Sequence, residues 1–470
     1  MRPVRLASFA LFTTGLLGFS TTGCEKSTRP VADNPPASSS GSSSAPGSAS
    51  DATASAAPAS SKHGPAPDDP MLANVAPAPM PPAEVTKSLA GASNGFAFDF
   101  WPRVGKTPGN AAFSPASMSV AFAMTWPGAK GETAAQIKKV MRFSQDAPAN
   151  ANAWGMFGRA LSSPGRPVKL RIANRLFGEK TYTFEAPFLD LTKNAFGAPM
   201  ELVDFKASSD ASRVHINDWV SEKTEQRIKD LLPPNGVNPN TLIVLVNALY
   251  FLGDWEEEFE KKSTTDEPFD VGGATRKSVP TMHATHPMAL AQADGAKVVE
   301  LRYKRGEASM FVVVPDKKDG LPALEKSMTA AKLEGWMKAA KSENVALSLP
   351  RFEVTTPSLE LGKEFAALGM TNAFDREKAD FTAMANPPSK ADRIYIAKVF
   401  HKAFVKVDEK GTEAAAATAI VGAKGGGAPA PPVEVKVDHP FLYFVVDKSS
   451  GLVLFMGRVD DPTATGNQVR

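Results

Sequence analysis

One stretch of small residues, lying between two strand-like segments, constrains the fold of this chain more than any other feature. The segments on either side, residues 394–407 and 433–446, alternate in polarity as strands of a packed sheet do. Residues 408–432 (DEKGTEAAAATAIVGAKGGGAPAPP) join them, and connections this long inside a compact domain are usually functional or disordered. The second half is rich in Gly and Pro, as linkers are. The first half, Thr412 to Val421, has neither, and it resembles a strand that has no place in a sheet.

The alternation of side chains within this first half supports the strand interpretation, because successive side chains of a strand face opposite sides. One face carries Thr412, Ala414, Ala416, Thr418, Ile420 and Gly422, and the other carries Glu413, Ala415, Ala417, Ala419 and Val421. The single charge, Glu413, leaves the first face uncharged and small enough to pass over a packed core. A solvated Ala-rich loop or a short helix is the alternative, since Ala is the best helix former.

Composition narrows the class of protein. The chain has 470 residues with 43% hydrophobic residues, which suits one large domain or two ordinary ones. The net charge of +3 is close to balanced, so neither a nucleic acid nor a strongly acidic partner is indicated. The only cysteine, Cys24, excludes a disulfide framework and any metal site built from several cysteines.

The first 24 residues have the layout of a secretory signal. Arg2 and Arg5 precede an apolar run over residues 6–19, which is short for a membrane span. The small residues before Cys24 resemble a bacterial lipobox, which predicts a signal peptide over residues 1–23 and a lipid on Cys24. We therefore expect a secreted protein anchored to the bacterial cell envelope, and Glu25 favours the outer membrane. An ordinary signal peptide or a short membrane anchor is the alternative.

The rest of the chain divides by composition. Residues 24–83 consist mostly of Ser, Ala, Pro and Gly, which bury too little apolar surface to fold, so they predict a disordered tether. A folded domain is expected over residues 84–463, with an exposed loop at about 409–432 and a flexible tail at 464–470. We expect a helix over 85–104, a second helix that follows the segment 110–119 and runs through Met124, a third after the turn at 128–133 through about Met141, and helices over 209–232 and 358–368. Strands are expected over 169–177, 241–252, 309–315 and 345–350. Helices come early and strands late, without regular alternation, so the fold class is α+β.

Motifs for catalysis are missing. The chain has no S-x-x-K, H-E-x-x-H, G-x-G-x-x-G or Walker sequence, and its one G-x-S-x-G match, residues 91–95 (GASNG), lies inside the helix expected over 85–104 instead of at the strand-to-helix turn that the motif requires. His283 and His286 are three residues apart beside Pro287 but have no carboxylate partner in view, so we expect no metal site and no cofactor. A Ser/His/Asp triad dispersed along the chain stays open as a second class of function, that of a surface hydrolase.

Several motifs, in order along the chain, together resemble the serpin family from about Glu84 to Pro462. Residues 408–415 (DEKGTEAA) resemble the hinge that opens the serpin reactive-centre loop, and residues 439–444 (HPFLYF) with 454–459 (LFMGRV) resemble the C-terminal signature. Asn110, Ser114 and Ser117 are similar to the early motif, and residues 128–131 (GAKG) to the turn after it. Residues 247–251 (NALYF) and Trp255 resemble the central strand of the main sheet and the tryptophan above it.

The resemblance implies a mechanism as well as a fold. It implies helices packed around a large main sheet, smaller sheets and an exposed loop that a serine protease attacks. The cleaved loop then enters the main sheet and holds the protease as a covalent acyl complex. The inhibitor would be a monomer that supplies no catalytic residue. The hinge would comprise Glu409, Gly411, Thr412, Glu413, Ala414, Ala415, Ala416, Ala417 and Thr418. The gate for sheet opening would comprise Ser114, Ser117, Asn247, His401 and Trp255.

The bond that serves as bait is predicted from charge and spacing. Lys424 is the only basic residue between Lys410 and Lys436, and a lone cation suits the acidic pocket of a trypsin-like protease, which favours Lys424–Gly425. The family's commonest spacing would instead place the cut at Gly425–Gly426. A cut after Ala423 or Val421 by an elastase- or subtilisin-type protease also stays open. A serpin that binds or chaperones without inhibiting is the main alternative function.

Overall fold

The computed structural model describes residues 78–271, 275–412 and 431–465. The predicted signal peptide, Cys24 and nearly all of the predicted tether lie outside these residues. Within the described part of the chain, no helix is both long and apolar enough to cross a membrane. The described residues hold two sheets and a set of helices, which confirms the α+β class.

The main sheet has seven strands, in the order β10-β12-β13-β4-β2-β3, with β11 also paired to β12. Its two long central strands, β4 and β12, run parallel to each other, and β2 runs antiparallel to β4. The bounds are β2 Lys169–Glu179, β3 Glu201–Val203, β4 Ile243–Asp254, β10 Phe352–Thr355, β11 Leu359–Glu360, β12 Lys398–Asp408 and β13 Gly411–Thr412.

The second sheet has nine strands, in the order β1-β16-β15-β8-β7-β6-β9-β14, with β5 paired to β6. Its bounds are β1 Ala111–Phe113, β5 Thr265–Asp270, β6 Arg276–Ala293, β7 Ala296–Arg302, β8 Ala308–Pro315, β9 Lys341–Pro350, β14 Val433–Lys436, β15 Phe441–Asp447 and β16 Leu452–Val459. β14, the first strand after the predicted loop, pairs in parallel with β9 and with no other strand of the described residues.

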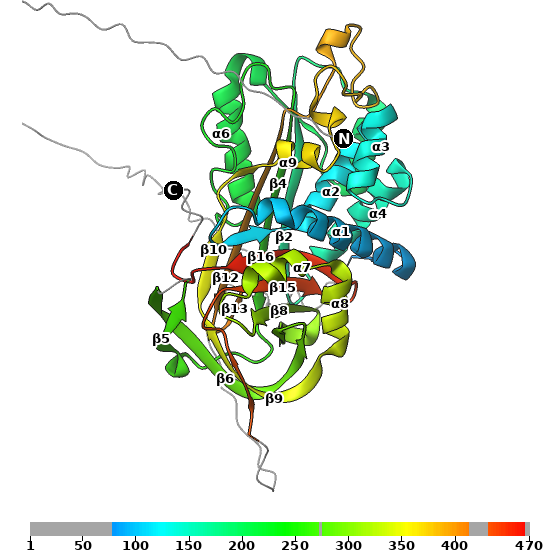
Figure 1. Cartoon of the computed structure of the whole chain (residues 1–470). Helices are drawn as coiled ribbons and strands as arrows, with labels where there is room; N and C mark the ends of the chain where they lie inside the picture. The colour runs from blue at the N-terminus through cyan, green and yellow to red at the C-terminus, as the bar shows by residue number, and fades with distance from the viewer. Residues whose placement is uncertain (1–77, 272–274, 413–430, 466–470) are drawn as a thin grey trace, which may run out of the picture. The chain divides into compact units, whose positions relative to one another are not determined.

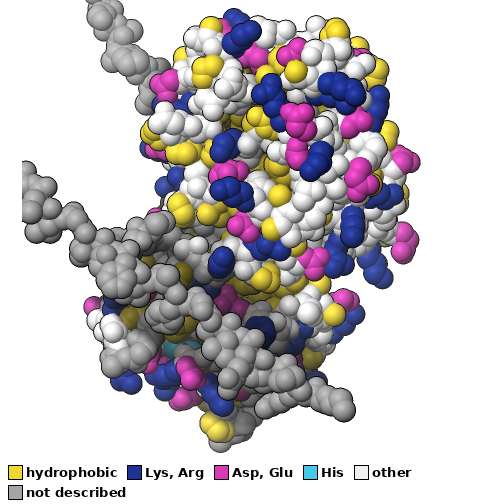
Figure 2. Space-filling model, turned by 45° about the horizontal axis from the view of Figure 1, so that its top comes forward, with side chains coloured by type: hydrophobic (Ala, Val, Ile, Leu, Met, Phe, Trp, Pro, Cys, Tyr) yellow, Lys and Arg dark blue, Asp and Glu magenta, His cyan; other side chains and the backbone are white. Residues whose placement is uncertain are grey.

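The helices cover the main sheet on both faces. α1 and α2 lie on one side of β4, and α6 lies on the other (Figure 1). The α-helices are α1 Ala83–Val104, α2 Pro115–Thr125, α3 Gly131–Val140, α4 Ala147–Leu161, α5 Ala186–Phe196, α6 Phe205–Lys223, α7 Leu321–Ser327, α8 Ala330–Ala339 and α9 Gly362–Ala367. On the face seen in Figure 2, Lys and Arg are interspersed with Asp and Glu, as the balanced net charge predicts.

β4 is apolar on both faces because it separates two cores. Ile243, Leu245, Leu249 and Phe251 belong to the large core, while Val244, Val246, Ala248 and Tyr250 pack with α6. A central strand covered on both faces reads as a continuous apolar run, which confirms the strand predicted over residues 241–252. Asn247 interrupts this run and is fully buried.

Three predicted elements have different bounds. The strand expected over 433–446 is two strands, β14 and β15. The strand pairing is interrupted at residues 437–440, where Pro440 offers no amide donor. The helix expected over 209–232 ends at Lys223, and the left-handed backbone at Glu225 and Gln226 prevents its continuation. The helix expected over 358–368 is only α9, because Leu359 and Glu360 pair with β12 instead.

Candidate functional site

The seam between β4 and β12 is the feature on which the site is built. The two strands pair directly from Lys398 and Val244 to Phe404 and Tyr250. Parallel neighbours in the centre of a sheet are normally joined by crossover connections and stay adjacent along their length. Here the direct pairing stops before the carboxyl ends of the strands, which leaves room between them.

β13 occupies that room. After Asp408 the chain turns back, so that Gly411 and Thr412 pair antiparallel with β12 on one side and with β4 on the other. Thr412 has no exposed surface, and Glu409 and Lys410 are also buried. The loop predicted to be exposed from residue 409 therefore begins inside the sheet. Gly411 is required here, since an added Cβ would lie 2.0 Å from the carbonyl oxygen of Gly253 on β4.

Two aromatic side chains hold the turn that leads into β13. The Trp255 indole Nε1 donates to the Asp408 carbonyl at 3.0 Å, and its backbone N–H donates to the Lys410 carbonyl at 2.6 Å. Trp255 stacks on Tyr303 with ring centroids 4.6 Å apart. The Tyr303 hydroxyl lies 2.7 Å from the Thr412 Oγ1. Burial raises the pKa of Tyr303, so its hydroxyl stays protonated.

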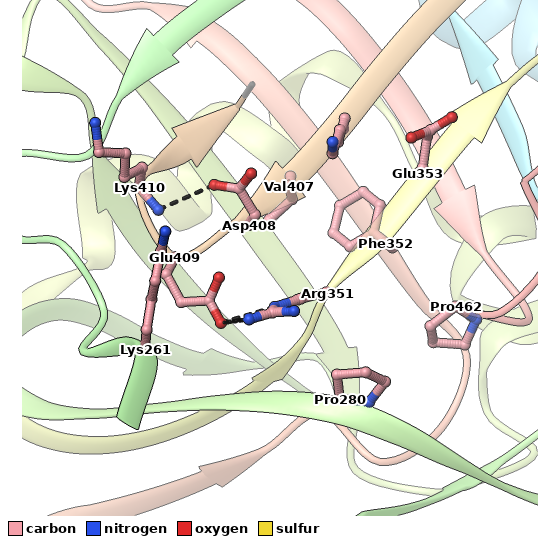
Figure 3. A pocket seen from close by; sticks show the side chains of 11 residues that line it. Lys261, Pro280, Arg351, Phe352, Glu353, Val407, Asp408, Glu409, Lys410 and Pro462 are labelled. Carbon is pink, nitrogen blue, oxygen red and sulfur yellow. Dashed lines mark hydrogen bonds and ion pairs between the residues drawn. The ribbon is translucent and has the colours of Figure 1, made fainter. Parts of the chain in front are cut away.

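An ion pair closes the outer side of the same turn. Arg351 Nε donates to a Glu409 carboxylate oxygen at 2.7 Å, and the Thr264 hydroxyl donates to the same oxygen at 2.5 Å. Burial by itself would raise the pKa of Glu409, but these hydrogen bonds outweigh it and hold the pKa below its ordinary value. Figure 3 shows the pair beside the Lys410–Asp408 contact, in a pocket of about 430 Å³.

A buried polar cluster lies under the part of the seam where β4 and β12 pair directly. Asn174 of β2, Asn247 of β4 and His401 of β12 occupy one row across the three strands. The Asn247 amide donates to Asn174 Oδ1 at 2.8 Å and to Ser117 Oγ at 2.6 Å. Ser114, the N-cap of α2, donates its hydroxyl to the Leu454 carbonyl at 2.8 Å and accepts from the Ser117 N–H.

The hydrogen bonds of the cluster fix the form of His401. The Ser114 backbone N–H donates to His401 Nε2 at 3.2 Å, so Nε2 carries no proton. The proton is therefore on Nδ1, which lies 2.5 Å from the side-chain Oδ1 of Asn247 and donates to it. Burial lowers the pKa of His401 to about 3, so the ring is neutral. The cluster is a satisfied, uncharged network that joins the two strands of the seam.

Comparison with known proteins identifies the family. The family model described as serpin (serine protease inhibitor) matches residues 91–462. The chain belongs to the serpin family. It is 38% identical to the human leukocyte elastase inhibitor over 386 residues, which cover 80% of this chain and all of that protein. It is 39% identical to serpin B6 of Macaca fascicularis, over 80% of this chain and 99% of that protein.

Solved serpin structures share the fold. Uncleaved ovalbumin superimposes with a TM-score of 0.73 at 28% identity, over 80% of this chain and all of that one. Human thyroxine-binding globulin, solved with thyroxine, has a TM-score of 0.73 at 26% identity over 81% of this chain and all of that one. The predicted serpin fold is thus confirmed, and the relatives named as protease inhibitors agree with the expected class of function.

The structure divides the predicted gate of this serpin between two places. Ser114, Ser117, Asn247 and His401 lie together in the polar cluster. Trp255 lies beyond the end of β4, beside the turn into β13, and makes none of the contacts of the cluster. It is a contact of the hinge rather than a member of the cluster under the seam.

Other predicted site residues fall outside the description. Glu409, Gly411 and Thr412 of the hinge are placed as above, whereas Glu413 to Thr418 and the bonds Lys424–Gly425 and Gly425–Gly426 lie outside the described residues. His283 Nε2 lies 3.2 Å from a Glu267 carboxylate oxygen, so the expectation that the two histidines have no carboxylate partner is wrong for His283. No group of three or more potential metal ligands occurs among the residues that the structure describes.

Four contributors to the site were missed from the sequence: Asn174, Thr264, Tyr303 and Arg351. Asn174 does not stand out as Asn247 does within the apolar run 241–252, because residues 169–177 (KLRIANRLF) also contain Lys169, Arg171 and Arg175. Arg351 and Thr264 do not stand out either. They are ordinary surface residue types, and only the fold brings them to Glu409.

Proposed function

We propose that this serpin inhibits serine proteases by inserting its cleaved loop between β4 and β12. The observation that carries the proposal is the register at the seam. Val407 and Gly253, which pair with Thr412 from either side, have the same offset along their strands as His401 and Asn247, which pair directly. Insertion therefore requires the strands to separate by one strand spacing, about 4.8 Å, without sliding along each other.

Continuing the register of β13 assigns each following loop residue a place between the two strands. Ala414 would lie opposite Val405, Ala416 opposite Ala403, and Thr418 opposite His401. Val405 and Ala403 face the large core, so the loop side chains on this face must be small and uncharged. The loop sequence meets this requirement, and Thr418 adds a hydroxyl beside the buried polar cluster.

On the opposite face the same register brings charges together. Glu413 would lie opposite Lys406 of β12, which already lies opposite Glu353 of β10. Cross-strand neighbours of opposite charge stabilise a sheet, whereas like charges destabilise it. Glu413, the only charged residue in the first half of the loop, would thus lie beside the cation of Lys406 in the expanded sheet.

The polar cluster resists premature opening under this proposal. Separating β4 from β12 breaks the His401–Asn247 hydrogen bond and leaves buried groups without partners until Thr418 arrives. The anchors around β13 have the opposite effect, because they keep the first two hinge residues already in place. Separating β4 from β12 therefore costs free energy where the two strands pair directly. At their carboxyl ends the strands are already separated by β13.

We propose Lys424–Gly425 as the bait bond, with a trypsin-like protease as the target, because Lys424 is the only basic residue between Lys410 and Lys436. Gly425–Gly426 and bonds after Ala423 or Val421 are the competitors. The similarity to leukocyte elastase inhibitors makes an elastase the second protease to test.

The test mixes the domain from residue 84 onward with trypsin or elastase at several ratios, followed by denaturing electrophoresis and mass spectrometry. We expect a complex that survives denaturant at about one serpin per trypsin, with a released fragment that begins at Gly425. Lys424→Ala should abolish the trypsin complex and leave the fold intact. A complex with another fragment start moves the bond. Cleavage without trapping by both proteases would refute inhibition and favour a binding role.

We also propose that the mature protein is attached to the cell envelope through a lipid on Cys24. The support is the sequence pattern before this residue alone. Expression of the full chain and of Cys24→Ala, followed by membrane fractionation and mass spectrometry of the N-terminal peptide, tests it. The lipidated peptide and membrane association should both disappear in the variant.

A further inference from the structure

A second cavity lies beside Trp255, the residue that holds the turn into β13. It has a volume of about 520 Å³ and lies between the Trp255–Glu257 segment, strands β6 and β7, and the end of α8. Met288, Leu301 and Met337 supply apolar surface, and Trp255 forms part of the wall. The cavity is large enough for a small organic molecule.

The charges around this cavity select the chemistry of its occupant. Three carboxylates line it, those of Glu256, Glu257 and Glu300, against one fixed cation, Arg302, and the imidazole of His286. Glu300 is already engaged by Lys448 at 2.6 Å and by the Ser309 hydroxyl at 2.8 Å. Glu256 and Glu257 are exposed and make no ion pair with any residue that the structure describes. The unmatched charge is negative, so a cation is favoured.

The same cavity is linked to the hinge through one side chain. Trp255 is 1% exposed, stacks on Tyr303 and makes two hydrogen bonds to the turn at Asp408 and Lys410. The Glu256 N–H donates to the Arg302 carbonyl at 2.8 Å, which fixes the wall segment to β7. A molecule in the cavity therefore packs against the residue that holds the first hinge residues in the sheet.

We infer that this cavity is a regulatory site for an amphipathic amine, with an apolar body against Trp255 and Met337 and an ammonium group at Glu256 and Glu257. The occupant binds the native arrangement, in which Trp255 is stacked on Tyr303. By filling the space behind Trp255, it stabilises the anchored hinge, which is already the first part of the inserted strand, and so favours entry of the rest of the loop into the sheet. The binding part is independent of the proposed inhibition, while the effect on trapping rests on it.

The binding test uses 4-phenylbutylamine as the probe and 4-phenylbutyrate as its anionic counterpart, in thermal unfolding of the domain at pH 8. The amine should raise the Tm by about 1 °C or more at millimolar concentration, and the carboxylate should not. The double substitution Glu256→Gln and Glu257→Gln, at exposed positions, should weaken amine binding about fivefold. Equal shifts with the two probes would overturn the site, since they indicate apolar partitioning alone.

Cavity filling gives a second, independent check. Ala340→Trp should remove the amine-dependent shift, whereas Ala330→Trp, at the other end of α8 and on a different cavity, should keep it. A shift that survives Ala340→Trp places the amine elsewhere and refutes the site. If Ala340→Trp does not fold, the double Gln variant decides the question.

The regulatory part is measured as the rate of trypsin trapping with and without the amine. We expect an increase of twofold or more in the wild type and a smaller one in the double Gln variant, whose amine binding is weaker. An unchanged rate despite a thermal shift would overturn regulation and keep the binding site. Absence of any trapping, with the thermal shift intact, would instead count against the proposed inhibition.

Discussion

The two ends of the β4–β12 seam differ in what lies between the strands. At the carboxyl end, β13 separates them, and Trp255, Tyr303 and Glu409 hold the intervening backbone. Toward the amino ends of the two strands, β4 and β12 pair directly, and His401 and Asn247 join them through a buried hydrogen bond. The offset between β4 and β12 is the same in both places. The carboxyl end, where β13 lies between the strands, therefore shows the geometry that the rest of the seam would take if a strand entered.

The difference teaches how a single sheet keeps one end open and the other closed. The open end is stabilised by interactions with the backbone of the turn and of β13, so its residues contact these segments rather than each other. The closed end is stabilised by polar contacts across the seam. Substitutions at the two ends should therefore have different signatures, and four of them test the comparison, beginning with the largest expected effect.

Thr412→Arg should abolish the open end. A guanidinium in place of the buried Thr412 hydroxyl lies beneath the sheet next to Tyr303 without a counter-charge, which costs several kcal/mol. We expect no denaturant-resistant complex, continued cleavage of the loop, and consumption of more than about ten serpins per protease inhibited. Glu434→Arg, an equally large charge change on exposed β14, serves as the control and should leave trapping unchanged. Unimpaired trapping by Thr412→Arg would contradict the assignment of β13 as the start of insertion.

The closed end should respond to pH through His401. Its folded pKa of about 3 is below the ordinary 6.5, so between these values only the unfolded state takes up a proton. Stability should be full above about pH 6.5 and decline as the pH falls toward 3, by up to about 1.4 kcal/mol per pH unit.

Urea unfolding of the wild type and of His401→Gln between pH 7.5 and 5 measures this effect. The variant should be less stable at pH 7.5 and show a smaller decline, whereas the control His286→Gln should keep the slope of the wild type. Parallel slopes for the wild type and His401→Gln would show that His401 does not couple to pH.

Gly411→Ala should move the hinge out of the open end while sparing the closed end. The new Cβ would meet the Gly253 carbonyl and the Asp254 Cα of β4, so the pairing of β13 must be given up. We expect a loss of about 1–3 kcal/mol in stability and faster hydrogen exchange at Thr412, with unchanged exchange at Asn247. Gly335→Ala in α8, where an added Cβ meets nothing within 4 Å, is the matched control. Protection at Thr412 that survives Gly411→Ala would refute the packing argument.

Lys406→Glu tests the part of β12 that lies between the residues paired with β13 and the residues paired directly with β4. It replaces attraction to Glu413 in the expanded sheet by repulsion, worth about 0.5–1 kcal/mol. Trapping should slow about threefold, as measured by stopped-flow association with trypsin. The reciprocal pair Lys406→Glu with Glu413→Lys should restore the rate. Failure of the double variant to recover would separate the effect of Lys406 from Glu413.

The sequence predicted those parts of the fold whose patterns are local and strong. The continuous apolar run of β4 and the helical spacing of α1 are confirmed, because burial on both faces or on one helix face leaves a periodic signal. The pattern failed where tertiary pairing competed with it. Leu359 and Glu360 form an edge strand on β12 in place of a helix turn, and the strand expected over 433–446 is interrupted before Pro440.

For the site, the sequence alone determined the small, uncharged face of the loop, the polar exception Asn247 in the apolar run 241–252, and the glycine at the hinge, since these depend on residue size, charge and backbone freedom. Only the tertiary structure decided three features of the site. The hinge begins inside the sheet, Trp255 contacts the hinge and lies outside the polar cluster, and Arg351 and Thr264 meet Glu409. The physical reason is that such contacts join residues far apart in the chain, whose positions depend on the packing of the whole domain and leave no pattern in any one segment.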